Sequence, residues 1–141
     1  MMMKKLVLLM VLLTAVLLTA CGGQTTASVV SADLNPATLP ASIDVKTVAA
    51  VKDRDDVLLL DVREQWEYDE GHIPGVTLMP MNEVAARLSE IPTDKEVIVT
   101  CRSGNRSGQV AEFLRAQGYD NVHNMEGGIL AWQAAGLSVD R

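Results

Sequence analysis

A cysteine, a glycine and two arginines gather in one short segment, residues 101–107, which reads Cys-Arg-Ser-Gly-Asn-Arg-Ser. The segment follows the β-branched run 97–100 and precedes a helical pattern that begins near Ser107. A buried strand that ends in a tight loop and leads into a helix directs backbone N–H groups and the positive end of the helix dipole at the loop. In such surroundings the pKa of a cysteine falls from about 8.5 to roughly 3.5–7.5, so its thiolate is available as a nucleophile.

We therefore predict that Cys101 is a catalytic nucleophile. The alternative is a cysteine of the hydrophobic core, because free cysteine is among the most buried residue types. Gly104 and the two arginines, Arg102 and Arg106, argue against it, since a segment that lines a core rarely carries two charges so close together.

The N-terminus has the features of a bacterial secretion signal. Lys4 and Lys5 precede the run 6–20, which is apolar except for two threonines. The run is shorter than the roughly 20 residues that a membrane-spanning helix needs, and it suits the core of a signal peptide; an uncleaved membrane anchor is the alternative. Residues 18–21, Leu-Thr-Ala-Cys, resemble the lipobox of bacterial lipoproteins, in which cleavage precedes the cysteine and the cysteine is acylated.

We expect residues 1–20 to be removed as a lipoprotein signal peptide and Cys21 to be lipidated. Several acyl chains would hold the protein firmly on the extracytoplasmic face of a bacterial membrane. Residues 21–41, rich in Gly, Thr, Ser and Ala, are predicted to be a flexible tether, with an ordered arm on the domain as the alternative. Residues 42–141 are long enough for one compact domain and too short for two.

Charge and cysteine usage limit the partners. Removal of Lys4 and Lys5 with the signal takes the formal net charge from −6 to −8, and an acidic surface repels the phosphates of nucleic acids.

If Cys21 is lipidated, Cys101 has no disulfide partner in its own chain. A lone thiol in an oxidising compartment indicates a function rather than a structural role. We expect a monomer with no nucleic-acid partner.

No metal or cofactor is expected. Cys101, His72 and His123 are widely separated in the sequence, and no closely spaced pair of metal ligands appears. No glycine-rich dinucleotide motif appears either.

From residue 43 onward, strand and helix patterns alternate, which is typical of an α/β sandwich with a central, mainly parallel sheet flanked by helices. The predicted strands are residues 57–60, 75–79, 97–100 and 121–125. The predicted helices are a short one capped by Asp44, a polar one over 64–70, one capped by Asn82 and ended by Pro92, one that follows the cysteine loop and ends near Gly118, and one from Gly127-Gly128 to Gly136.

Three segments resemble the signatures of the rhodanese family. Residues 61–75, Asp-Val-Arg-Glu-Gln-Trp-Glu-Tyr-Asp-Glu-Gly-His-Ile-Pro-Gly, look like the first signature. Residues 101–106 are similar to the six-residue active loop of rhodanese sulfurtransferases, and residues 127–136 resemble the C-terminal signature. Because all three occur in the right order and spacing, the resemblance implies a single-domain rhodanese-like sandwich.

The resemblance also implies a reaction. The Cys101 thiolate attacks the outer sulfur of a donor such as thiosulfate, becomes a persulfide, and passes the sulfur to a thiophilic acceptor such as cyanide or a thiol. Backbone N–H groups of the loop can stabilise the anionic persulfide, and the two guanidinium groups can orient a sulfonate-like donor. The predicted substrate- and persulfide-binding residues are Arg102, Ser103, Gly104, Asn105 and Arg106.

Other residues receive supporting or structural roles. Asp61 and Arg63 end a predicted strand on the same sheet edge as Cys101, where either residue could border the pocket. A pair that braces two loops is the alternative, and we rank both as supporting residues. The two histidines, His72 and His123, are interpreted as structural. The aromatic residues Trp66, Tyr68 and Trp132 are all expected in the core or a pocket wall, and only Trp132 is a candidate for the edge of the active cleft.

Two other functions stay open. Related folds use a Cys-x5-Arg loop as phosphatases or arsenate reductases, whereas Arg106 gives a shorter Cys-x4-Arg loop here. A persulfide relay or redox-sensing thiol module with little turnover is the second alternative. An inactive scaffold is disfavoured because inactive relatives usually lack the cysteine.

Overall fold

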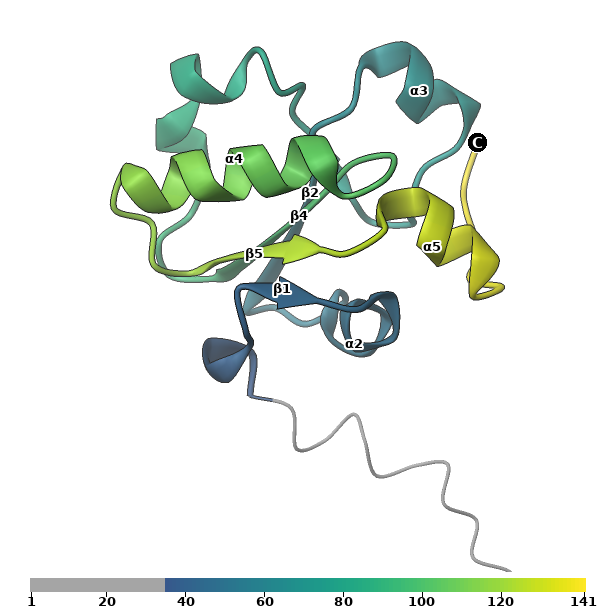
Figure 1. Cartoon of the computed structure of the whole chain (residues 1–141), viewed down its shortest axis with the longest axis horizontal. Coiled ribbons are helices and arrows are strands. Elements are labelled where there is room, and N and C mark those ends of the chain that lie inside the picture. The colour runs from purple at the N-terminus through teal and green to yellow at the C-terminus, as the bar shows by residue number, and fades with distance from the viewer. Residues whose placement is uncertain (1–34) are drawn as a thin grey trace, which may run out of the picture.

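The computed structural model describes residues 35–141; the predicted signal peptide, Cys21 and most of the predicted tether lie outside the described residues. Five strands form one sheet in the order β1-β5-β4-β2-β3, and all four pairings are parallel. The strands are β1 (Ser42–Ile43), β2 (Val57–Asp61), β3 (Thr77–Leu78), β4 (Glu96–Thr100) and β5 (Val122–Met125). The predicted α/β sandwich with a mainly parallel sheet is confirmed (Figure 1).

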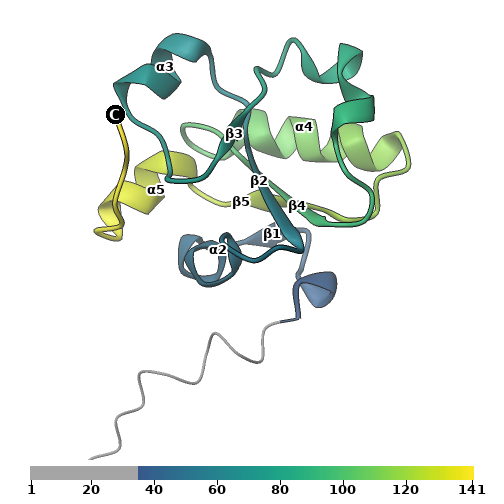
Figure 2. The same cartoon turned by 180° about the vertical axis from the view of Figure 1, so that it is seen from behind.

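Helices cover both faces of the sheet (Figures 1 and 2). On one face lie α2 (Val45–Val51) and α5 (Gly128–Ala134), and on the other lies α4 (Asn105–Ala116). Strand side chains alternate between the two cores: Val97 and Val99 face α4, whereas Ile98 faces α2 and α5. Because both faces are covered, β2 and β4 contain continuous apolar runs, residues 57–60 and 97–99, which is the pattern that predicts them.

The helix predicted from Asn82 to Pro92 is wrong. This segment forms two 3-10 helices, η2 (Val84–Ala86) and η3 (Leu88–Glu90). They break at Arg87, whose φ of −117° and ψ of 22° leave the helical region. Val84 and Ile91 both reach the core, so two short turns satisfy the same apolar spacing that predicts one helix. The strand predicted over 75–79 is also shorter, since only β3 pairs with β2.

The end of the predicted tether, residues 35–41, contacts the domain. A 3-10 helix, η1 (Pro36–Thr38), buries Pro36. The Pro40 carbonyl accepts a hydrogen bond from His123 Nδ1 at 2.8 Å, and the Ala41 carbonyl accepts one from the Asn124 N–H at 2.8 Å. Within residues 35–141, no helix has the length and apolar character needed to cross a membrane.

Candidate active site

Cys101 lies at the junction of β4 and α4, where the carboxyl ends of the parallel strands meet. The chain turns through Gly104, whose φ of 94° is left-handed, and α4 begins at the next residue. A Cβ at Gly104 would lie 3.0 Å from the Gly127 nitrogen, so both the dihedral and the close approach require glycine. The loop therefore wraps tightly around the side chain of Cys101.

Hydrogen bonds in the loop converge on the sulfur. Cys101 Sγ accepts the Gly104 N–H at 3.1 Å and the Ser107 hydroxyl at 3.3 Å, and the residue is only 1% exposed. Burial is the largest single influence and raises the pKa of Cys101, but hydrogen bonds from the Ser107 side chain and from the N–H groups of Ser107, Ser103 and Gly104 together lower it by more. The net shift is downward, so the thiolate forms at a lower pH than that of an ordinary thiol.

The remaining loop residues differ in their surroundings. Arg102, Ser103 and Asn105 are exposed at the surface of the loop. Arg106 instead turns its guanidinium onto the carboxylate of Glu67, with both N–O distances at 2.7 Å. Two arginines were predicted to orient an anionic donor. Arg106 is bound to the Glu67 carboxylate, whereas Arg102 is exposed.

Glu67 is the site residue that the sequence analysis missed. It belongs to α3 (Gln65–Glu70), and its carboxylate also accepts the Glu64 N–H at 3.1 Å as part of a capping box. Arg106 holds the pKa of the Glu67 carboxyl below its usual value by donating hydrogen bonds to it. The Glu-x-x-Glu spacing marks the helix start, but nothing local in the sequence links Glu67 to a residue 39 positions away.

Asp61 and Arg63 form a buried ion pair at the end of β2. The Arg63 Nη2 atom lies 2.7 Å from Asp61 Oδ2, and the guanidinium also donates to the backbone carbonyls of Glu67 and Gly71. These four groups fasten the middle and the C-terminal end of α3 to the carboxyl end of β2. The arrangement is that of a brace between two loops.

The N-terminus of α5 binds the other side of the active loop. The Ile129 N–H donates to the Cys101 carbonyl at 2.9 Å, and the Leu130 N–H donates to the Arg102 carbonyl at 3.1 Å. Gly128, with a φ of 58°, passes so close to the loop that a Cβ would lie 2.6 Å from the Arg102 carbonyl carbon. The C-terminal signature thus provides the backbone surface on which the loop rests.

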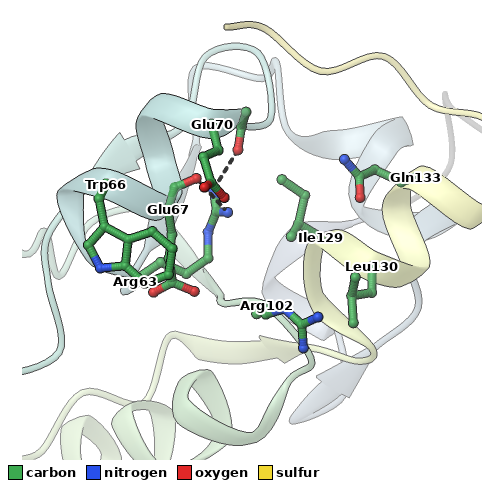
Figure 3. Close-up of a pocket in the computed structure, with 9 residues that line it drawn as sticks. Arg63, Trp66, Glu67, Glu70, Arg102, Ile129, Leu130 and Gln133 are labelled. Carbon is green, nitrogen blue, oxygen red and sulfur yellow. Dashed lines mark hydrogen bonds between the residues drawn. The ribbon is translucent and has the colours of Figure 1, made fainter.

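A cleft of about 210 Å³ lies between α3 and α5, with Arg102 at its base (Figure 3). Its walls include Trp66, Glu67 and Glu70 from α3 and Ile129 and Leu130 from α5. It adjoins the active loop, because Arg102 is the residue that follows the nucleophile.

Both tryptophans take one of their expected places, Trp66 in a pocket wall and Trp132 in the core, but it is Trp66 and not Trp132 that borders the cleft. Trp66 is 63% exposed and lines this cleft, whereas Trp132 is 2% exposed in the core, where its indole N–H donates to the Ser138 carbonyl at 2.8 Å. Successive residues of a helix point in directions about 100° apart. Because Glu67 turns inward to Arg106, its neighbour Trp66 turns outward.

The histidines take part in structural contacts. His72 Nδ1 donates to the Tyr68 carbonyl at 3.1 Å, and the two rings stack with centroids 3.8 Å apart. His123 Nε2 lies 2.7 Å from a carboxylate oxygen of Glu96, the first residue of β4, at the end of that strand opposite Cys101. Among residues 35–141, no three His, Cys, Asp or Glu side chains gather as a metal ion would require.

Comparison with known proteins agrees with this geometry. The sequence profile of the rhodanese-like domain matches residues 44–135. A sulfurtransferase of Allochromatium vinosum is 46% identical over 87 residues, which cover 62% of this chain and 81% of that protein. The thiosulfate sulfurtransferase GlpE of Pseudoalteromonas translucida is 33% identical over 93 residues, 66% of this chain and 89% of that protein. A rhodanese-related protein of Thermoplasma volcanium has a crystal structure that covers 72% of this chain and 98% of its own, with a TM-score of 0.65 and 32% identity. The chain therefore belongs to the rhodanese-like domain family and is a sulfurtransferase of the rhodanese type.

Proposed function

We propose that the protein transfers sulfane sulfur from a donor such as thiosulfate to a thiophilic acceptor through a persulfide on Cys101. The observation that carries this proposal is the convergence of the Gly104 N–H and the Ser107 hydroxyl on Cys101 Sγ. These donors lower the pKa of the thiol, and they can stabilise a second, terminal sulfur that bears negative charge.

Two balanced steps make up the reaction. In the first, the Cys101 thiolate attacks the outer sulfur of thiosulfate; the S–S bond of the donor breaks, sulfite leaves with the electron pair, and a cysteine persulfide anion forms. In the second, the acceptor attacks the terminal sulfur: cyanide becomes thiocyanate and the thiolate returns. Arg102, exposed beside the nucleophile, is suited to orient the anionic donor.

The test combines mass spectrometry with turnover. Purified protein incubated with thiosulfate is expected to gain about 32 Da, one sulfur atom on the nucleophile, and to release thiocyanate when cyanide is added. Cys101→Ser removes the nucleophile, so both signals should vanish in this control.

The same experiment separates the alternatives. An adduct without turnover would favour a persulfide relay over an enzyme, and the absence of both would contradict the sulfurtransfer proposal.

A phosphatase or arsenate reductase is disfavoured by a further observation. In those enzymes the arginine that ends the loop would have to bind a tetrahedral oxyanion. Here that arginine, Arg106, donates two hydrogen bonds to Glu67 instead.

We also propose that the protein is exported and anchored to a bacterial membrane through acylated Cys21. The support is the basic start, the apolar run 6–20 and the lipobox-like residues 18–21. Cells fed labelled palmitate should incorporate label into the wild-type chain and retain it in the membrane pellet. Cys21→Ala should lose the label; an unlabelled wild-type chain would contradict the anchor.

A further inference from the structure

We propose that Glu67 is a positioning residue of the sulfur-transfer reaction: by binding the Arg106 guanidinium, it holds that cation in a neutral pair and limits its attraction for the anionic sulfur of Cys101. This inference rests on the proposed role of Cys101 as the nucleophile and adds a residue that controls its reactivity. The Glu67 carboxylate acts through Arg106, because its hydrogen bonds go to Arg106 and to the Glu64 N–H.

Arg106 lies where a free cation would act on the sulfur. It is the second residue of α4, so it belongs to the helix N-terminus, whose dipole already favours negative charge at the loop. The pKa of Arg106 is raised chiefly by its hydrogen bonds to Glu67 and, more weakly, by the charges of Cys101 and Asp61. The guanidinium therefore interacts with the thiolate, and without a partner it would favour the charged form of Cys101 further.

The pair with Glu67 is held firmly. Two guanidinium nitrogens of Arg106 lie 2.7 Å from the two carboxylate oxygens, and the Glu64 N–H fixes the carboxylate from another side at 3.1 Å. The Glu67 side chain is 9% exposed and that of Arg106 is 34% exposed, so solvent screens the carboxylate little. Paired contacts of this kind are strong and fix the orientation of both groups. At the longer distance of the sulfur, the two opposite charges largely cancel.

This compensation matters because the nucleophilicity of a thiolate falls as the pKa of its thiol falls. Cys101 already receives stabilisation from two fixed dipoles, the Gly104 N–H and the Ser107 hydroxyl. A full positive charge in addition would produce more thiolate but a weaker nucleophile. Glu67 thus sets the balance between the amount of thiolate and its reactivity toward the sulfur donor.

The experiment titrates Cys101 in the full chain by the pH dependence of its alkylation with iodoacetamide, measured by mass spectrometry on the peptide that contains Cys101. Glu67→Gln preserves the size of the side chain and removes its charge, so the midpoint should fall by about 0.5–1 unit. Arg106→Gln leaves the Glu67 carboxylate uncompensated, so the midpoint should rise. The double variant lacks both charges, and its midpoint should return close to that of the wild type.

Two further measurements accompany the titration. At pH values above the midpoint, the thiolate of Glu67→Gln should be alkylated about twofold more slowly, since its nucleophilicity falls with the pKa. The acid limb of kcat/KM for thiosulfate should shift with the alkylation midpoint. Asp69→Asn is the matched control: it removes an exposed carboxylate of the same helix, which binds Gln65, and it should leave the midpoint unchanged.

Shifts in opposite directions in the two single variants, cancelled in the double variant, would support the proposal. A shift in the same direction in both would mean that the pair only holds the loop in place, and it would overturn the proposal, as would an unchanged midpoint in Glu67→Gln. If Glu67→Gln folds poorly, Arg106→Gln gives the same test from the more exposed partner. Alkylation requires no sulfur donor, so a wild-type protein that forms no persulfide would contradict the proposed function while the titration still decides the role of Glu67.

Discussion

Gly128→Ala is expected to lower sulfur transfer by about a hundredfold, because a displacement of roughly 1 Å in a catalytic loop costs this much. The new Cβ would overlap the carbonyl oxygen of Cys101 and lie 2.6 Å from the carbonyl carbon and oxygen of Arg102. These carbonyls belong to the loop that holds the sulfur, so the loop must move away from α5. Backbone strain at φ 58° and overpacking should together destabilise the fold by about 2–4 kcal/mol.

Gly136→Ala is the matched control for this prediction. Gly136 also has a positive φ, 74°, but a Cβ there would meet nothing within 4 Å. We expect it to cost only the left-handed strain, about 1 kcal/mol, with unchanged kcat/KM. Thiocyanate assays and urea unfolding of both variants measure these effects. If Gly128→Ala retained wild-type turnover, the close approach of α5 would not be what holds the loop.

Asp61→Asn is expected to destabilise the protein by about 3–5 kcal/mol, because it leaves the buried cation of Arg63 without its charge partner. The side chains of Arg63 and Asp61 are almost completely buried, with 5% and 2% of their surface exposed. The substitution preserves the size and shape of the Asp61 side chain. The loss therefore reports charge compensation rather than packing. The midpoint of urea denaturation should fall with little change in its slope.

Asp56→Asn provides the comparison, since Asp56 pairs with Arg54 at the surface, where solvent screens the interaction. Its unfolding midpoint should hardly move. Similar losses in both variants would contradict the prediction that burial makes the Asp61–Arg63 pair the more costly of the two to break.

The fold was largely predictable because its central strands and α4 have strong local patterns. β4 contains the apolar run 97–99, and the helix after it is confirmed, with Gly118 just beyond its end. Of the apolar face predicted for that helix, Val110 and Leu114 are buried, whereas Phe113 is 37% exposed. The order of strand, loop and helix is enough to bring Cys101 to the carboxyl edge of a parallel sheet.

What escaped prediction depends on contacts between distant segments. The sequence places Arg106 in the loop, but its partner Glu67 is defined only when α3 packs beside the loop. The outward turn of Trp66 follows from that same contact. In residues 82–92 both one helix and two 3-10 turns can bury Val84 and Ile91, and the local pattern does not distinguish them.

The hydrogen bond between the Pro40 carbonyl and His123 Nδ1 holds the chain where it enters the domain. Because β1 runs parallel to β5 and residues 35–41 precede it, the chain enters at the amino end of the sheet, where His123 also binds Glu96. The active loop lies at the opposite, carboxyl end. An attachment through the N-terminal segment would therefore join the domain at the end opposite the active loop, and the attached segment would enter the domain without crossing the entrance to the catalytic site.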